Sequence, residues 1–491
     1  MKASRYNFFA QKSDGKIAFN AFSAALGLFS EQTCNLYERV VSTGDKNLSE
    51  REKVVLEELV KAHFIVPKDF DELKALQVRM NRRRYDSSLL GLTIMPTAAC
   101  NLRCRYCYEK TSEKKMSPET IDALVGFVKD SISTAKRFDV TWYGGEPLLE
   151  KKTIYDLSSR FLEACQELNC YYSAGIITNG VLLDGETARR LATECSINFC
   201  QVTLDGPRSV HNARRPFKDG SGTYDAILKN LQEASRYLRI NIRINIDSEN
   251  EVNYLELLDD LELYNLKDKA DIHIGMVEPV GFARVCADTT SKCLDDEKMA
   301  EYQRHFYSTA TQRGFSAQFY LVPANVFGLC AAEIDNSFVV EPDGSLHKCW
   351  VTVGDEKERV GNIRTGVPQS TQLLKWVSFD PTIYEECREC RVLPLCFGNC
   401  VYRAQESVDG LHCGMWKYKL EKVLESIEEF QGPLEKYIDE VRSVGTDIRW
   451  VYEGVNSRKR CCTIVCVRCT SLGGVECTFG QCKPLKVGGK K

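Results

Sequence analysis

Histidine is scarce in this chain, and other absences narrow its chemistry further. Six of the 491 residues are His, which leaves little support for catalysis or metal binding built on imidazole. No run of about 18 apolar residues occurs, and the N-terminal stretch MKASRYNFFAQKSDGKIAF has no apolar segment behind a basic start. The sequence therefore predicts no membrane association and no secretory leader, and we expect a cytoplasmic protein.

An excess of positive charge is also missing. Lys and Arg number 65 against 68 Asp and Glu, so the formal net charge is -3. This balance argues against a nucleic-acid binder that depends on a globally basic surface. Cysteine, in contrast, is abundant at 23 residues, too many for a reduced cytosolic enzyme unless most of them bind metal. Metal clusters are the consistent explanation, and their oxygen sensitivity predicts an anaerobic or micro-aerobic host.

Three of these cysteines stand close together in TAACNLRCRYCYE, at Cys100, Cys104 and Cys107. Soft thiolates select iron-sulfur clusters or zinc. A structural zinc site needs four ligands, and no fourth Cys or His follows within reach, although a zinc knuckle or a chance grouping is the alternative. Three thiolates can hold three corners of a 4Fe-4S cube and leave the fourth iron open. The motif therefore predicts a cluster with an iron available for chemistry.

From about residue 90, short β-branched runs alternate with longer amphipathic stretches, which is typical of βα units around a parallel sheet. Ser117 and Pro118 are a good helix start, and 253–266 reads as another helix. In such folds the active groups lie at the carboxyl ends of the strands. Six strands are predicted, at Leu90–Thr97, Phe138–Tyr143, Ala174–Thr178, Phe199–Leu204, Ile240–Asp247 and Asp271–Val277.

The CxxxCxxC spacing after the first strand, with Tyr106 before the third cysteine, resembles the signature of radical S-adenosylmethionine (SAM) enzymes. The resemblance implies that SAM chelates the open iron and is cleaved to a 5'-deoxyadenosyl radical that abstracts hydrogen from a substrate. The six predicted βα units are fewer than the eight of a full barrel, so we expect an α/β fold with a partial (β/α)6 barrel, open on one side to a bulky substrate such as a peptide. A small electron-donor protein such as a flavodoxin or ferredoxin is also implied.

Strand ends supply the expected cofactor contacts. Gly144, Gly145 and Glu146 in WYGGEP resemble the turn that holds the SAM amino group, since glycines allow close approach and a carboxylate accepts from an ammonium. Asn179 closes the third strand. The resemblance to the sulfatase-maturase-like branch assigns SAM polar contacts to Thr203 and Arg215, with Asp205 bracing its turn. A turn-stabilising role for the Arg214–Arg215 pair is the alternative.

A second cysteine framework follows downstream. Cys330, Gly344 and Cys349 form one block, and ECRECRVLPLCFGNC with Cys413 forms another. This pattern resembles the SPASM domain, an extension that carries auxiliary 4Fe-4S clusters. The resemblance implies one fully ligated cluster and a second cluster that lacks a local fourth ligand. The first is assigned Cys387, Cys390, Cys396 and Cys413, and the second Cys330, Cys349 and Cys400.

The missing ligand has two explanations. Either Cys286 or Cys293 closes the second auxiliary cluster, or its iron is open to a substrate thiolate, which would suit a cysteine-containing peptide. The remaining cysteines of the predicted helices and strands are expected to be core residues. They are Cys34, Cys165, Cys170, Cys195 and Cys200.

The two ends of the chain look different from the barrel. In 1–85, helical spacing of Val54, Leu56, Leu59 and Val60 precedes RMNRRRY, interpreted as a solvated basic linker. This small α+β unit resembles peptide-recognition domains, with a plain structural cap on the barrel as the alternative. We expect the barrel at 86–285, a linker at 286–325, the SPASM domain at 326–430, and a helix with a basic tail at 431–491. Tail residues Cys462, Cys466 and Cys469 repeat the CxxxCxxC spacing. The tail is therefore interpreted as the site of an extra cluster, a substrate-like segment or a disordered basic extension.

Together these features predict an enzyme that modifies a ribosomally made precursor peptide, by a thioether or carbon-carbon crosslink. An anaerobic sulfatase maturase forming formylglycine is the alternative. In that group an Asp, the proposed base, follows the cysteine equivalent to Cys349, and here Trp350 stands there. A non-catalytic iron-sulfur electron carrier is an alternative of another class, but it needs neither the GGEP turn nor an open iron.

Overall fold

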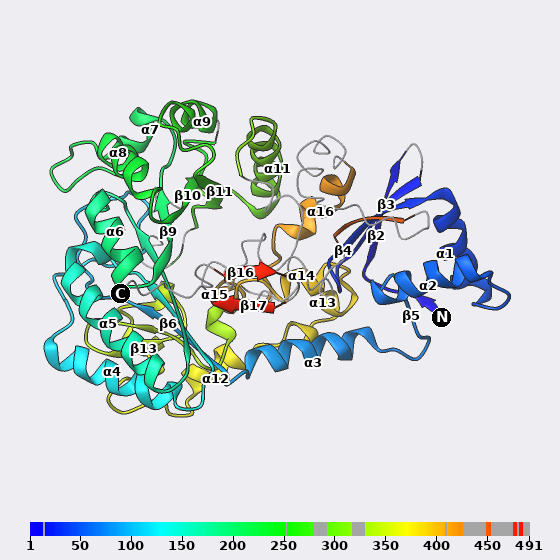
Figure 1. Cartoon of the computed structure of the whole chain (residues 1–491), viewed down its shortest axis with the longest axis horizontal. Coiled ribbons are helices and arrows are strands. Elements are labelled where there is room, and N and C mark those ends of the chain that lie inside the picture. Colours follow the sequence, from blue (N-terminus) through cyan, green and yellow to red (C-terminus); the bar gives the residue numbers. More distant parts are fainter. Residues whose placement is uncertain are drawn as a thin grey trace.

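A computed structural model of the chain describes residues 1–12, 15–251, 253–278, 280, 292–316, 329–407 and 410–425, with three strands further on. Its centre is a nine-stranded sheet whose first six strands run parallel in chain order, as predicted (Figure 1). These strands are β6 (Leu89–Ile94), β7 (Arg137–Trp142), β8 (Tyr171–Thr178), β9 (Ile197–Thr203), β10 (Arg239–Ile246) and β11 (Ala270–Met276).

Helices follow the parallel strands as crossover connections. They are α4 (Pro118–Ile132), η1 (Pro147–Glu150), α5 (Lys151–Glu167), α6 (Gly185–Glu194), α7 (Arg208–Arg214), α8 (Tyr224–Ala234), α9 (Tyr254–Leu263) and α11 (Asp296–Gln312). Ser117 caps α4 by accepting a hydrogen bond from the Thr120 N–H, and Pro118 takes the first helical position, as the sequence predicts. The partial α/β barrel is therefore confirmed.

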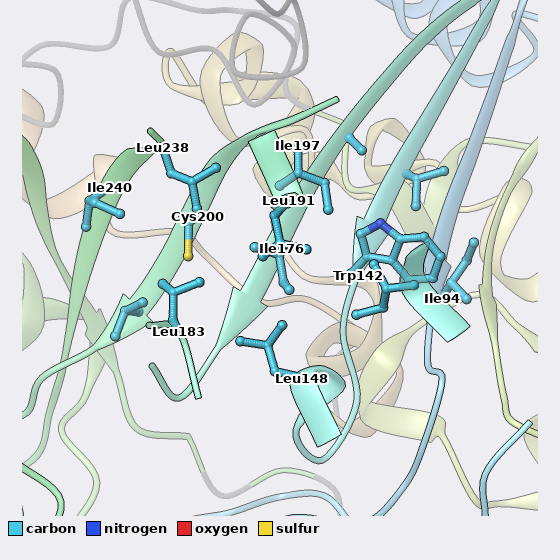
Figure 2. Close-up of a cluster of buried hydrophobic side chains, with 14 of the residues drawn as sticks. Ile94, Trp142, Leu148, Ile176, Leu183, Leu191, Ile197, Cys200, Leu238 and Ile240 are labelled. Atoms are coloured by element: carbon cyan, nitrogen blue, oxygen red, sulfur yellow. The ribbon is translucent and has the colours of Figure 1, made fainter. Parts of the chain in front are cut away.

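The core between sheet and helices is apolar and closed. Trp142 and Ile94, from neighbouring strands, pack in the same layer as Ile176 (Figure 2). Cys200 is fully buried there, and Cys165, Cys170 and Cys195 are also buried, so the prediction of core cysteines holds for these four. Cys34 is half-buried.

The C-terminal part of the described chain is joined to this sheet. β12 pairs in parallel with β6, from Ser337 opposite Gly91 to Val340 opposite Ile94, and β13 and β14 continue antiparallel. The elements of this region are η4 (Ala331–Glu333), β12 (Ser337–Val340), β13 (Ser345–His347), η5 (Trp350–Thr352), η6 (Glu356–Glu358), β14 (Gly361–Asn362), α12 (Thr371–Val377), η7 (Pro381–Ile383), α13 (Glu385–Glu389), α14 (Leu393–Cys396), α15 (Val401–Glu406) and α16 (Trp416–Glu425).

The N-terminal unit is a small antiparallel sheet with three helices, at the far side of the molecule from the parallel sheet (Figure 1). It shares an apolar core with Leu393, Phe397 and Leu420 of the region around α14 and α16. Its elements are β1 (Lys2–Ala3), β2 (Asn7–Lys12), β3 (Gly15–Asn20), β4 (Ala25–Ser30), α1 (Glu31–Thr43), α2 (Glu50–Lys61), β5 (Ile65–Val66) and α3 (Glu72–Arg84). In α2 the buried face carries Val55, Leu56 and Leu59, whereas Val54 is exposed, so the predicted phase was partly wrong.

The prediction of a solvated basic linker also has to be corrected. RMNRRRY is the end of α3 rather than a solvated connector, and its Met80 and Arg84 are buried. Arg84 forms a buried ion pair with Glu333, with Nη2 3.2 Å from Oε1, and donates to the Phe379 carbonyl oxygen at 2.6 Å. One arginine of the charged run therefore fastens the N-terminal unit to the region of η4.

Three strands lie beyond α16. β15 (Ile448–Tyr452) pairs antiparallel with β4, and β16 (Val475–Thr478) pairs with β17 (Gln481–Pro484). Cys286, segments 286–291 and 317–325 of the predicted linker, and tail residues Cys462, Cys466 and Cys469 lie outside the described residues. The described middle of that predicted linker is largely helix α11. Within the described part of the chain, no helix has the length and apolar character to cross a membrane.

Candidate active site

The cysteine loop after β6 brings Cys100, Cys104 and Cys107 together. The Cys107 N–H donates to the Cys104 carbonyl oxygen at 3.3 Å, and the Leu102 N–H points at the Cys100 sulfur at 3.5 Å. Burial raises the pKa of the Cys107 thiol to about 12, and the neighbouring Cys104 and Cys100 thiols act in the same direction. Thiols so placed release protons when a metal binds.

The loop is fixed from its opposite side by the segment after α7. Main-chain bonds join Arg103 to Pro216 at 2.9 Å and Lys218 to Asn101 at 3.2 Å. The Asn179 side chain, at the end of β8, donates to the Asn101 side-chain oxygen at 2.8 Å. The cysteine loop is thus held between the ends of several strands, where the fold places active groups.

The glycine turn after β7 approaches this loop through its backbone. Gly144 has φ of +121°, and a Cβ there would lie 2.5 Å from the Thr97 carbonyl oxygen. A Cβ on Gly145 would lie 2.4 Å from the Ala99 oxygen. The Glu146 N–H donates to that same Ala99 oxygen at 2.9 Å. Both glycines are required because the turn and the cysteine loop touch through main-chain atoms.

Glu146 is fully buried beneath this turn. Its carboxylate accepts from the Leu148 N–H at 3.0 Å, the Thr178 hydroxyl at 2.7 Å and the Asn179 N–H at 2.8 Å. Burial raises the pKa of Glu146, while these donors act against the rise. A carboxylate has about four lone-pair directions, so three protein donors leave about one for an ammonium group.

Tyr106 centres a second polar network. Its hydroxyl donates to the Asp205 carboxylate and accepts from Arg215 Nη1 at 2.8 Å and Asn245 Nδ2 at 3.1 Å. Asp205 also accepts from the Asn245 N–H at 3.0 Å, consistent with bracing its turn. Arg214 Nη1 instead donates to both carboxylate oxygens of Asp247, at 2.8 Å to each. Arg215 therefore faces the cysteine loop, whereas Arg214 stabilises the strand ends.

Thr203 ends β9 and is buried opposite Arg243 of β10. Sequence reasoning did not single out Asn245 or Asp247 as site residues. Both belong to the fifth predicted strand, at the carboxyl edge that the other site residues share, and that position was the available signal.

An aromatic and acidic cluster adjoins the glycine turn at Tyr143. The Tyr143 and Tyr108 hydroxyls are hydrogen-bonded to each other, and burial raises the pKa of the neighbouring Glu109 to about 7. Trp350 reaches this cluster from η5, with its ring centroid 5.2 Å from that of Tyr143. Sequence analysis did not anticipate this contact, which joins the first cysteine site to the region of Cys349.

The downstream cysteines form two groups. Burial raises the pKa of Cys396 to about 12, with further increases from its neighbours Cys390, Cys387 and Cys413. Burial likewise raises the pKa of Cys349, with contributions from Cys330 and Cys400. The structure thus brings together the same two sets that the sequence pattern groups.

The second set shares a local geometry. Cys330, Cys349 and Cys400 each cap a short helical turn, η4, η5 and α15 respectively. Burial raises the pKa of Cys349, and main-chain N–H groups of Val351 and Thr352 act against that rise, in the direction of the thiolate that a metal needs. The charges of Glu278 and Arg403, which form an ion pair at 2.7 Å, act on the thiols of both Cys293 and Cys400.

The donor sets suit clusters rather than single ions. Among the residues described, no group of three or more His, Cys, Asp or Glu converges closely enough to hold one metal ion. A 4Fe-4S cube binds each thiolate through a different iron, so its ligands stand further apart. Three neighbouring thiols, a buried carboxylate with a lone pair to spare and a buried arginine fit a 4Fe-4S cluster that carries an amino acid-like ligand.

Comparison with known proteins agrees with this geometry. Residues 94–261 match the family described as the Radical SAM superfamily. The serine-type anaerobic sulfatase-maturating enzyme of Klebsiella aerogenes is 23% identical over 356 residues, which cover 68% of this chain and 85% of that enzyme. The cysteine-type anaerobic sulfatase-maturating enzyme of Clostridium perfringens strain 13 is 23% identical over 341 residues, covering 63% and 88%.

The fold is also found among solved structures. Native anSMEcpe with bound AdoMet and the Cp18Cys peptide superposes with a TM-score of 0.56 at 20% identity, over 71% of this chain and 99% of that chain. At this level of identity the likeness concerns the fold.

Proposed function

Because this chain is a radical SAM enzyme with SAM and a 4Fe-4S cluster as cofactors, we propose that it crosslinks a ribosomally made peptide through a thioether or carbon-carbon bond. As an enzyme of this class it is not a non-catalytic electron carrier. When bound, the cofactors supply a 5'-deoxyadenosyl radical that removes a hydrogen atom from the substrate.

The proposed ligands of the catalytic cluster are Cys100, Cys104 and Cys107. Glu146 would accept a hydrogen bond from the SAM ammonium group, since its carboxylate keeps a lone pair after three protein donors. Arg215 would orient the SAM carboxylate as a planar, permanently charged donor. Tyr106, Asn179 and Thr203 complete the proposed cofactor contacts, together with Gly144 and Gly145.

The contact between Trp350 and Tyr143 is the observation that carries the choice of reaction. At the position where sulfatase maturases are expected to have an Asp base, an indole ring packs on the aromatic cluster beside the glycine turn. An indole cannot accept a proton as a carboxylate does. The replacement of the expected Asp base by an indole at this position favours coupling within a peptide over formation of formylglycine.

Two auxiliary 4Fe-4S clusters belong to the proposal. Cys387, Cys390, Cys396 and Cys413 would close one, and Cys330, Cys349 and Cys400 would hold the other. Cys293 is the candidate fourth ligand within the described residues, because it shares the neighbours Glu278 and Arg403 with Cys400. A flavodoxin or ferredoxin as electron donor and a cytoplasmic location complete the proposal.

Sulfatase maturation is the second candidate, favoured by similarity that spans 85% of the Klebsiella aerogenes enzyme. The test uses the reconstituted enzyme with SAM, a reductant and either a sulfatase-derived peptide or a cysteine-rich peptide. Crosslinking removes two hydrogen atoms and creates no aldehyde, whereas the aldehyde of formylglycine reacts with a hydrazide. A hydrazide-reactive product from the sulfatase peptide, with the cysteine-rich peptide unchanged, would overturn the crosslinking proposal.

A further inference from the structure

The outer edge of β4 is occupied by a strand from the other end of the chain. β4 pairs with β3 along its full length, from Ala25 opposite Asn20 to Ser30 opposite Gly15. On its other side β15 pairs antiparallel, with Ile448 opposite Phe29 and Trp450 opposite Gly27. β4 is almost wholly apolar, and an apolar strand with an open edge is a template for pairing with another strand.

The register of β15 has the character of peptide docking. Strand addition obtains affinity from main-chain hydrogen bonds and specificity from alternate side chains. The segment IRWVY is rich in aromatic and β-branched residues, and the register sets Trp450 opposite the residue of β4 that has no side chain. The β-bulge between Trp450 and Tyr452 then ends the regular pairing.

The sequence that follows β15 has a composition unlike the rest of the chain. Residues 461–482 contain Cys461, Cys462, Cys466, Cys469, Cys477 and Cys482, none of which belongs to the proposed clusters. From 453 to 491, eight Lys and Arg stand against two Glu, although the whole chain has a net charge of -3. In the hairpin of β16 and β17, Cys477 and Cys482 are directly opposite each other.

We propose that the edge of β4 binds residues 448–452 of this chain and thereby presents its own residues 461–482 to the enzyme as the peptide substrate. The proposal rests on the proposed peptide modification. Eight residues separate Tyr452 from Cys461, and these nine Cα-to-Cα steps allow a reach of about 30 Å when extended. A tethered strand competes at a local concentration of about millimolar, so it excludes a free peptide from the same edge.

Hydrogen exchange on the full chain tests the docking without any turnover. The double variant Arg449→Pro with Trp450→Pro removes the N–H groups of two adjacent residues. Successive N–H groups of a strand point to opposite sides, so one of the two lost groups faces β4. Those amides of Ala25–Ser30 that face β15 should exchange at least tenfold faster, whereas those bonded to β3 should stay protected. A labelled peptide of residues 446–455 should bind at least tenfold tighter than to the unmodified chain. The matched pair Val467→Pro with Arg468→Pro should leave both readings unchanged. Equal exchange in the two double variants would overturn the docking.

Mass mapping tests the role as substrate. In the reconstituted chain with SAM and reductant, residues 461–482 should lose hydrogen atoms and thiols, and the 449/450 proline variant should show at least tenfold less change. An unmodified tail in a chain that still forms 5'-deoxyadenosine overturns the substrate assignment and leaves radical SAM activity intact. If no 5'-deoxyadenosine forms, the proposed function itself is wrong. The substrate assignment then falls with it, whatever hydrogen exchange shows about docking of the strand.

Discussion

The two cysteine regions of this protein are built by different means. Around Cys100, Cys104 and Cys107, buried charged and polar side chains such as Glu146, Asp205 and Arg215 converge from several strand ends. Cys349 and Cys400 instead occupy the N-cap positions of short helical turns, where nearby main-chain N–H groups act against the rise in the pKa of each thiol. The first arrangement suits recognition of a polar organic ligand, and the second suits retention of inorganic clusters.

The sharpest test of this difference removes the first trio. Replacing Cys100, Cys104 and Cys107 by Ala should abolish SAM cleavage, because these thiols are the proposed ligands of the cluster that binds SAM. Iron content should fall by about one 4Fe-4S cluster, with the auxiliary clusters retained. Anaerobic iron analysis and 5'-deoxyadenosine formation measure both, with Cys34→Ala as the control. Loss of all iron would show that the two regions are not independent.

The stability of the region around Cys330 and Cys349 should depend on its attachment to the N-terminal unit more strongly than that of the first cysteine site does. Arg84→Ala leaves the buried Glu333 carboxylate without its ion partner, and breaking such a pair costs about 3–5 kcal/mol. Chemical denaturation of the chain should report this loss. Arg82→Ala, on the exposed face of the same helix, should change the unfolding free energy by less than about 0.5 kcal/mol. Equal effects from the two variants would contradict the anchoring role.

Removing one charge should affect SAM binding at the first site more than its folding. Glu146→Gln keeps the shape but lacks the charge proposed to meet the ammonium, so SAM affinity should fall about ten- to hundredfold. Equilibrium binding to the reconstituted enzyme gives the value, and Glu150→Gln in the next turn is the control. Unchanged affinity would mean that Glu146 only stabilises the turn.

The smallest expected effect concerns acid sensitivity of the first site. His211 is fully buried, with Nδ1 accepting from the Asp205 N–H at 3.3 Å, and burial holds its pKa well below the ordinary value. The folded state keeps it neutral while the unfolded state takes up a proton below about pH 6.5. Stability should therefore fall as the pH drops below about 6.5, by about 1.4 kcal/mol per pH unit from this group.

Comparing unfolding at several pH values in His211→Gln and in the exposed His305→Gln isolates the effect. The first variant should show a flatter pH dependence between about pH 5 and 6.5 than the second. Parallel curves for both variants would assign the acid sensitivity to other groups.

The parallel strands could be predicted because each is a short run rich in apolar and β-branched residues, as in LLGLTI and RINIRINI, separated from the next by a longer amphipathic stretch. Every one of the six lies within three residues of its predicted start and end. Their carboxyl ends then indicated where Glu146, Asn179, Thr203 and Arg215 would gather. Polar groups at the carboxyl ends of parallel strands lie at the same edge of the sheet, and this position does not depend on the conformation of the loops between the strands.

Long-range partners could not be predicted. β12 has four residues and no periodicity of its own, so its pairing with β6 is decided by the open edge that it meets. Arg84 looked solvated because its carboxylate partner is 249 residues away. The sequence shows that Trp350 stands where an Asp is expected in sulfatase maturases. Its packing on Tyr143 could not be predicted, because it depends on how η5 meets the glycine turn.

The pairing of β12 with β6 also has a consequence during synthesis. β6 emerges from the ribosome about 240 residues before β12, and until then one edge of LLGLTI has no partner. At about 5–20 residues per second this interval lasts roughly 10–50 s. A nascent chain in that state carries an open apolar edge, so ribosome stalling before residue 337 should produce aggregating fragments that depend on chaperones.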